Sequence, residues 1–232
     1  MVTIRAASLA FTGGLVALGG CDGGKQPAGG TGTAPTGQTS SRLAEPDRDQ
    51  PGLGPGDRVP HSTLRDADGR EITLASLHSK GPVVVMFYRG GWCPYCTRAL
   101  TAWNARLKEF AALGVSVVAI SPERPERAVE TSGKTGSAIP VLCDERMEVA
   151  AAFGIQFEVD ATTRAHYSQL GLDLSAWNAS GTWKLAAPGT FLIDGDGVVR
   201  YAFADWDYTR RADPAIVLDA ARKLIGRSHG AG

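Results

Sequence analysis

Two cysteines with a spacing suited to chemistry, Cys93 and Cys96, stand in the segment FYRGGWCPYC, directly after the apolar run PVVVM. Such a pair can be half of a metal site, a structural disulfide or a pair that exchanges electrons. A zinc site needs two further ligands at suitable spacing, and the chain has no second Cys-x-x-Cys and only scattered histidines. A disulfide across so small a loop would stabilise the fold only weakly. Redox exchange is therefore the chemistry that this spacing favours, with no metal and no cofactor.

The position of the pair at a helix start gives it a specific reactivity. Pro94 suits the first position of a helix, because its missing N–H would be unpaired there in any case. The free N–H groups and the dipole at a helix N-terminus stabilise a thiolate, which is the nucleophilic form of cysteine. The second thiol, one turn away, can then form a disulfide with the first and expel whatever it has captured. The sequence thus predicts an ionised thiol in this segment at neutral pH.

Alternating strands and helices must position the pair. PVVVMFY predicts a strand buried on both faces, followed by a helix from Pro94 to Gly114. The other predicted elements are a hairpin around Asp68-Gly69, a short turn or helix in ASLHSK, strands in VSVVAIS and AIPVLCD, helices after Pro125 and in ERMEVAAAFG, a hairpin around Gly195–Gly197, and a helix from Pro214 to Gly226 capped by Asp213. This order predicts an α/β fold with a central mixed β-sheet flanked by helices and an N-terminal β-hairpin. Residues 156–186 fit less well and are interpreted as an insertion over the sheet.

The first 52 residues predict targeting and tethering. Residues 1–21, MVTIRAASLAFTGGLVALGGC, have the layout of a secretory signal and are too short for a comfortable membrane span. Residues 22–52 are rich in Gly, Pro, Ser and Thr and predict a disordered linker, so that the folded domain is expected at 53–228. LGGC resembles the bacterial lipobox, which implies lipidation at Cys21 and a lipid-anchored domain on the extracytoplasmic side of the cell envelope. A plain signal peptide or a membrane anchor with a chance cysteine is the alternative.

The charge and the number of cysteines exclude two further classes of protein. The chain has 232 residues with 24 Lys and Arg against 24 Asp and Glu, so no net charge favours binding to nucleic acid. Its four cysteines are too few for a disulfide-stapled scaffold. Cys143, at the end of a predicted strand, is expected to be a small buried apolar residue, with a resolving role as the alternative.

Several segments, in order, resemble the alkyl hydroperoxide reductase C and thiol-specific antioxidant (peroxiredoxin-like) family of the thioredoxin-fold superfamily. They are PGDRVPHSTLRDADG, FYRGGWCPYC, AISPE, VLCDE, APGTFLIDGDGVVR and ADWDYTRR. The resemblance implies a thioredoxin-like fold and a peroxidase that reduces H2O2 or organic hydroperoxides. It also implies that a thioredoxin-like external dithiol resets the Cys93–Cys96 disulfide.

The resemblance leaves the order of attack open. Aligned on FY, the peroxide-attacking cysteine of the family falls on Cys96, the family's Thr on Cys93 and its Pro on Arg89. The WCPYC motif is instead similar to thioredoxins, in which Cys93 would attack first. Trp92 is expected to pack as a lid over the pair.

The family's arginine before the ATF strand is replaced by Pro188. Thioredoxins have a cis-proline there that faces the cysteines, whereas an ordinary trans-proline at a strand start is the alternative. Arg89 either replaces the missing cation or points to solvent, and both stay open.

Two further functions compete with the peroxidase. One is a thioredoxin-like thiol–disulfide oxidoreductase that acts on protein disulfides, which the intact Cys-x-x-Cys and Pro188 favour. The other is a non-catalytic surface lipoprotein that only binds a partner, although such a protein would not need two thiols at a helix start. Four aromatic residues, Trp177, Trp183, Trp206 and Tyr208, are expected to pack the insertion rather than wall the site.

Overall fold

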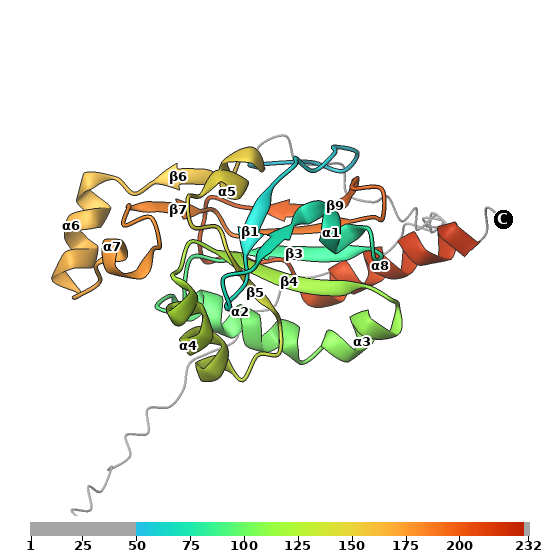
Figure 1. Cartoon of the computed structure of the whole chain (residues 1–232), viewed down its shortest axis with the longest axis horizontal. Coiled ribbons are helices and arrows are strands. Elements are labelled where there is room, and N and C mark those ends of the chain that lie inside the picture. Colours follow the sequence, from blue (N-terminus) through green and yellow to red (C-terminus); the bar gives the residue numbers. More distant parts are fainter. Residues whose placement is uncertain (1–49, 230–232) are drawn as a thin grey trace, which may run out of the picture. The chain divides into compact units, whose positions relative to one another are not determined.

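The computed structural model describes residues 50–229 of the chain (Figure 1). The predicted signal segment, the lipidation residue Cys21 and nearly all of the predicted linker lie outside these residues, so they stay predictions. No helix within residues 50–229 is both long and apolar enough to cross a membrane.

A seven-stranded mixed sheet forms the centre of the domain, as predicted. Its strands in spatial order are β2 (Glu71–Thr73), β1 (Thr63–Arg65), β5 (Val141–Cys143), β4 (Ser116–Ser121), β3 (Val83–Phe87), β8 (Gly189–Ile193) and β9 (Val199–Ala204). β3, β4 and β5 are parallel, and β8 runs antiparallel to β3. The hairpin of β1 and β2 extends one edge, as predicted for the N-terminal hairpin, and the hairpin of β8 and β9 forms the other.

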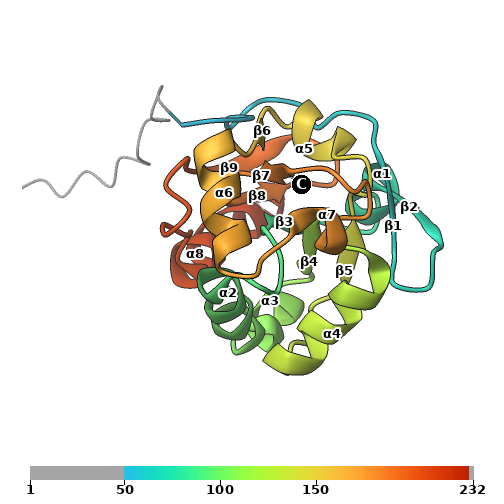
Figure 2. The same ribbon diagram turned by 90° about the vertical axis from the view of Figure 1, so that its left-hand side faces the viewer.

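Helices cover both faces of the sheet. They are α1 (Leu74–His78), α2 (Pro94–Asn104), α3 (Leu107–Ala112), α4 (Pro125–Thr135), α5 (Glu148–Ala152), α6 (Ala161–Gln169), α7 (Leu174–Trp177) and α8 (Pro214–His229). α2, α3, α4 and α8 pack on one face, and α1 and α5 lie on the other (Figures 1 and 2).

The central strand β3 divides the interior into two cores. Val84 and Met86 point to the face of α2 and α8, where Trp103 stacks on Phe110 with ring centroids 5.4 Å apart. Val83, Val85 and Phe87 point to the opposite face. All five β3 residues are buried, which confirms the prediction of a strand covered on both sides. The packing of β3 between the two cores holds its end at Phe87 in place, and the segment that carries the two cysteines begins there.

Two helix predictions were wrong in their bounds. One helix was expected from Pro94 to Gly114, whereas α2 ends at Asn104 and α3 begins at Leu107. The apolar residues keep helical spacing across this break, so their pattern does not reveal it. The last helix was expected to end at Gly226 but continues to His229, since a glycine can also adopt helical dihedral angles.

The insertion does not lie over the sheet as expected. Its two strands, β6 (Gln156–Glu158) and β7 (Lys184–Ala186), form a separate antiparallel pair that carries α6 and α7 beyond one end of the central sheet (Figures 1 and 2). The insertion has a small core of its own, made of Val159, Leu174 and Leu185. Trp92 and Tyr167 pack against this core, which brings the insertion to the Cys-x-x-Cys segment.

Candidate active site

The loop after β3 places both cysteines in the first turn of α2. Cys93 is the N-cap residue, with extended backbone angles, and Pro94 occupies the first helical position as predicted. The Cys93 carbonyl accepts the N–H groups of Cys96 at 3.0 Å and Thr97 at 3.1 Å, which closes the first turn. Both cysteines are free thiols, 2% and 0% exposed respectively. The geometry therefore joins a thiol pair to a helix N-terminus inside the protein.

Two nitrogen donors converge on the Cys96 sulfur. The backbone N–H of Arg89 donates to Cys96 Sγ at 3.4 Å, and Nη2 of Arg211 donates to the same atom at 3.3 Å. Hydrogen bonds to sulfur are weak when the thiol is neutral and strengthen when it is a thiolate. Cys96 Sγ is thus surrounded by groups that stabilise negative charge.

The two thiols titrate as a pair. The hydrogen bond from the Cys96 side chain lowers the pKa of Cys93 to about 6, and the charges of Arg89 and Arg211 act in the same direction against the effect of burial. Burial raises the pKa of Cys96 well above its usual range, and the hydrogen bond and charge of Cys93 add to this. The two pKa shifts mean that Cys93 ionises before Cys96. The two nitrogen donors, however, contact the sulfur of Cys96. Because the two thiols interact this strongly, the low pKa belongs to the pair rather than to one sulfur alone.

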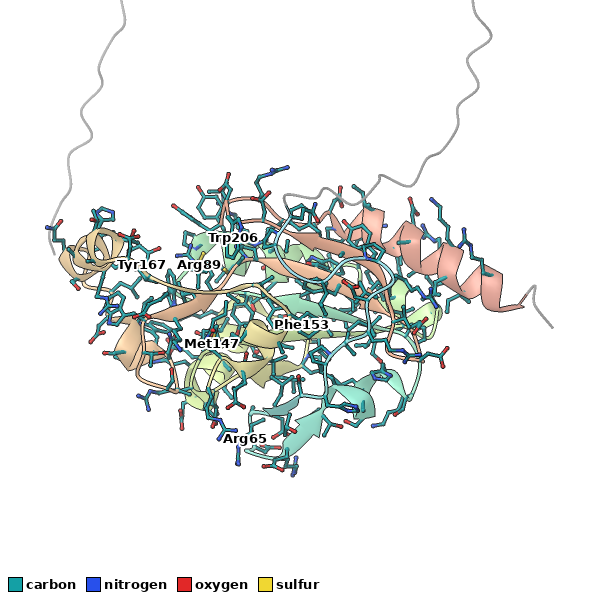
Figure 3. The ribbon with its side chains drawn as sticks, turned by 90° about the horizontal axis from the view of Figure 1, so that it is seen from above. Arg65, Arg89, Met147, Phe153, Tyr167 and Trp206 are labelled. Atoms are coloured by element: carbon teal, nitrogen blue, oxygen red, sulfur yellow. The ribbon has the colours of Figure 1, made fainter. Side chains whose placement is uncertain are left out.

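The Arg89 side chain lies in a box of aromatic rings rather than on a sulfur. Arg89 is 3% exposed, and its Cζ lies 4.9 Å from the ring centroid of Trp92 and 4.4 Å from that of Tyr208. Nη2 of Arg89 donates to the Tyr167 hydroxyl, and Figure 3 shows these two side chains next to each other. Arg89 therefore neither points to solvent nor contacts Cys96 through its guanidinium, and the cation on that sulfur is Arg211.

The fully buried carboxylate of Glu123 accepts hydrogen bonds from the loop that follows β3. Glu123 follows β4 and is 0% exposed. Its Oε2 accepts the Tyr88 hydroxyl at 2.7 Å, and its Oε1 accepts the Gly91 N–H at 2.8 Å. The Thr131 hydroxyl lies 3.3 Å from Oε1. Glu123 thus fixes both ends of the segment that carries the Arg89 N–H. Sequence reasoning did not select Glu123, although it lies in the quoted segment AISPE.

Pro188 and Cys143 lie at buried positions. Pro188 directly precedes β8, whose Gly189 pairs with Phe87, so it lies at the end of the sheet where the loop from Tyr88 to Trp92 begins. Cys143 is 1% exposed at the end of β5, as expected for a small buried apolar residue. Burial raises the pKa of Cys143 to about 12, which keeps it a neutral thiol at physiological pH.

Some of the large aromatic residues pack away from the cysteines, and others line the site around Arg89. Trp177 stacks under Arg127 and Trp183 under Arg164, in agreement with a packing role for both. Tyr208 instead walls the site, because its ring lies against Arg89 and is 5.7 Å from that of Tyr95. Trp92 packs edge-on to Tyr167 at 5.8 Å and lies between the insertion and the main core.

Sequence reasoning missed Arg211 and Tyr167. Arg211 is 115 positions from Cys96 and Tyr167 is 78 positions from Arg89, so local spacing could not link them. Arg211 does lie in the segment ADWDYTRR, which resembles the family, and this was the only available signal. Tyr167 lies in the insertion and had none.

No group of three or more His, Cys, Asp or Glu residues within positions 50–229 is arranged to hold a metal ion.

Residues 55–202 match the AhpC/TSA family. The chain belongs to this family. A Mycobacterium tuberculosis protein named as a peroxiredoxin is 37% identical to this chain over 102 residues. That match covers 44% of this chain and 64% of the relative, slightly less than two thirds of its length. Peroxiredoxin Bcp of Escherichia coli K12 is 26% identical over 161 residues, which cover 69% of this chain and 92% of that protein.

Two solved structures, of a peroxidoxin and a peroxiredoxin, share this fold. The crystal structure of peroxidoxin BcpB from Mycobacterium tuberculosis superposes with a TM-score of 0.60 at 25% identity, and the match covers 74% of this chain and 98% of that one. Peroxiredoxin Q of Xanthomonas campestris, at 21% identity, has a TM-score of 0.56 and covers 71% of this chain and 91% of that chain. The thioredoxin-like fold expected from the sequence is thus confirmed.

Proposed function

We propose that this chain is a thiol peroxidase that reduces H2O2 or organic hydroperoxides through Cys93 and Cys96. The observation that carries the proposal is the convergence of the Arg89 N–H and the Arg211 guanidinium on Cys96 Sγ, beside a second thiol. Membership of the AhpC/TSA family and the peroxiredoxin names of its relatives support the same activity.

In the proposed reaction a proton passes from Cys96 to the Cys93 thiolate, and the Cys96 thiolate then attacks the terminal oxygen of the hydroperoxide. The O–O bond breaks, Cys96 becomes a sulfenic acid, and the leaving alkoxide or hydroxide takes up a proton to give an alcohol or water. The Arg211 guanidinium stabilises the thiolate before attack and the developing charge during it.

The second thiol completes the cycle. Cys93 attacks the sulfenic sulfur of Cys96, a disulfide forms and the sulfenic oxygen leaves as water. An external dithiol of the thioredoxin type then reduces this disulfide by exchange and returns both thiols. A thioredoxin-like protein is therefore the proposed reductant.

Peroxide consumption tests the proposal. We would add excess H2O2 to the reduced chain with a thioredoxin and thioredoxin reductase system and follow NADPH oxidation. We expect turnover that requires both cysteines and is lost in Cys96→Ser. Peroxide consumption no faster than that of the Cys93→Ser, Cys96→Ser double variant would contradict it.

A thiol–disulfide oxidoreductase is the second candidate, favoured by the lowered pKa of Cys93, about 6, at the N-cap of α2. In that reaction Cys93 attacks a protein disulfide and Cys96 expels the substrate. Rapid reduction of insulin disulfides together with slow reaction with peroxide would select this function over the first.

We further propose that the domain is lipid-anchored at Cys21 on the extracytoplasmic side of the bacterial envelope. The apolar segment of residues 1–21 and its end LGGC support this. Labelling of growing cells with a palmitate analogue tests it: the parent chain should carry the label and partition with membranes. A labelled Cys21→Ala variant would contradict the assignment.

A further inference from the structure

The strongest unexplained feature outside the cysteines themselves is the buried charge of Arg89. No carboxylate within residues 50–229 forms an ion pair with it, and its Nε is buried without a hydrogen-bond partner. A buried cation without a counter-ion is costly unless other groups stabilise it. Here three aromatic rings surround the guanidinium at 4.4 to 5.9 Å.

One of these groups comes from the insertion. Tyr167 on α6 accepts a hydrogen bond from Nη2 of Arg89 through its hydroxyl, and its ring packs edge-on to Trp92, with centroids 5.8 Å apart. α6 has no buried residue, and Tyr167 on it is half-buried against the small core of the insertion, where Trp92 also packs. Figure 3 shows Tyr167 projecting from the insertion toward Arg89.

Arg89 is also joined to the thiol pair. Its backbone N–H contacts Cys96 Sγ, and the indole of Trp92, the residue before Cys93, lies under its guanidinium. The charged groups that face the pair are Arg89 and Arg211, and the phenols that face Arg89 are those of Tyr167 and Tyr208. The charge of Arg89 therefore acts on the pair, where it favours the thiolate of Cys93.

We propose that Tyr167 is a positioning residue for the redox pair: it holds the Arg89 guanidinium in the aromatic box, where Arg89 serves as a counter-ion of the thiolate. The insertion at residues 156–186 is then part of the redox site rather than a surface addition. Because it concerns the same cysteines, this inference rests on the proposed function. It also explains the direction in which Arg89 moves the pKa of Cys93, which is downward.

A titration of the thiols tests the proposal without any turnover. The full chain with Cys21→Ser would be reduced, and thiolate absorbance at 240 nm followed from pH 4 to 9. Cys143, with a pKa of about 12, stays silent in this window. Tyr167→Phe keeps the ring and removes only the hydroxyl, so the fold is retained, as near-UV circular dichroism would verify.

We expect Tyr167→Phe to raise the apparent pKa of the pair by about half a unit to one unit, and Arg89→Gln by about one to two units, since a nearby opposite charge shifts a pKa by this order. Arg164→Gln is the matched control. Arg164 is on the same helix, stacks over Trp183 at 5.1 Å and pairs with Glu158, away from the cysteines. It should leave the pKa of the pair unchanged.

Two results would overturn the proposal: an unchanged pKa in Tyr167→Phe, or an equal shift in Arg164→Gln, which would indicate general loosening of the insertion. The rate of peroxide reaction gives a second readout. Tyr167→Phe should be slower than the parent near pH 5.5 and equal to it near pH 8.5, where the pair is ionised in both. A chain that shows the pKa shift but consumes no peroxide would refute the peroxidase and leave the role of Tyr167 intact.

Discussion

At the scale of single residues, the site depends on which groups surround two buried sulfurs. Cys96 Sγ has a backbone N–H and a guanidinium within 3.4 Å, while Cys93 has the helix N-terminus and the lowered pKa. The two cysteines therefore differ in environment although they are three positions apart. In the proposed reaction, this difference assigns the attack to Cys96 and the resolving role to Cys93.

Arg211 should control the rate of attack. Replacing Arg211 by Met removes the charged donor from Cys96 Sγ, and loss of one such donor typically slows a reaction by on the order of 100-fold. Stopped-flow peroxide kinetics on the reduced chain would measure this. Arg210→Met is the control, because Arg210 is exposed and pairs with Asp205 at 2.7 Å instead. Equal rates for the two variants would show that Arg211 does not act on the sulfur.

The stability of the reduced chain should depend on pH in a defined window. The pKa of Cys93 falls from 9.0 to about 6 on folding, so between these values the unfolded chain binds more protons at Cys93 than the folded chain. The free energy of unfolding should then rise with pH from about 6 to 9, by at most about 1.4 kcal/mol per pH unit for one proton.

Above pH 9 the free energy of unfolding should change with pH in the opposite direction. The raised pKa values of Cys96 and Cys143 keep both thiols protonated in the folded chain after they ionise in the unfolded one, so stability should fall. Urea unfolding of the reduced chain at pH 6, 8.5 and 10.5 would measure both trends. Cys93→Ser should lack the rise between pH 6 and 9. A rise of the same size in that variant would assign it to other groups.

At the scale of elements, the loop from Tyr88 to Trp92 is held in place by hydrogen bonds and packing from neighbouring elements. Glu123 at the end of β4 accepts hydrogen bonds from both ends of the segment Tyr88–Gly91. Gly91 has no room for a side chain, since a Cβ there would lie 1.9 Å from the Thr131 hydroxyl. The loop is therefore packed tightly between β3, β4 and α4.

Glu123→Ala should destabilise the fold by about 2 to 4 kcal/mol, because it leaves buried donors on Tyr88 and Gly91 without acceptors. Chemical denaturation would measure the loss. Glu126→Ala, an exposed acidic residue in the first turn of α4, is the control and should change stability by about 0.5 kcal/mol or less. Similar losses of stability in both variants would contradict the role of Glu123 as the acceptor that holds Tyr88 and Gly91.

The sequence predicted most elements because their signals are local. The buried run before Cys93, Pro94 at the helix start and the turn at Gly195–Gly197 each fix a backbone conformation by their own chemistry. The break between α2 and α3 carries no glycine or proline, so apolar periodicity concealed it. The partners of the cysteines could not be predicted, since Arg211 and Tyr167 reach the site only through the tertiary fold.

At the scale of the whole molecule, the domain has two large cores and a small third one in the insertion. The large cores contain the sheet and its covering helices, and neither includes a residue from positions 159–183 as a buried member. The insertion and the main body are thus separable as packing units. Contacts between them include Trp92 with Tyr167, Arg127 with Trp177, and the backbone bonds from Arg124 N to the Trp177 carbonyl at 3.0 Å and from Ala179 N to the Pro122 carbonyl at 2.9 Å.

The main body should therefore fold without the insertion. Glu158 and Lys184 are paired across β6 and β7, so an Asn-Gly turn can replace residues 159–183. We expect cooperative urea unfolding, measured by circular dichroism, at a lower midpoint than in the parent chain. Non-cooperative unfolding would show that the insertion is required for the two main cores.

The central claim is that Cys96 is the sulfur that attacks peroxide, and trapping of its sulfenic acid tests this most directly. The reduced Cys93→Ser and Cys96→Ser chains would each be treated with one equivalent of H2O2 and dimedone, and the labelled peptide identified by mass spectrometry. We predict a dimedone adduct on Cys96 in Cys93→Ser and none on Cys93 in Cys96→Ser. An adduct on Cys93 with none on Cys96 would contradict the account.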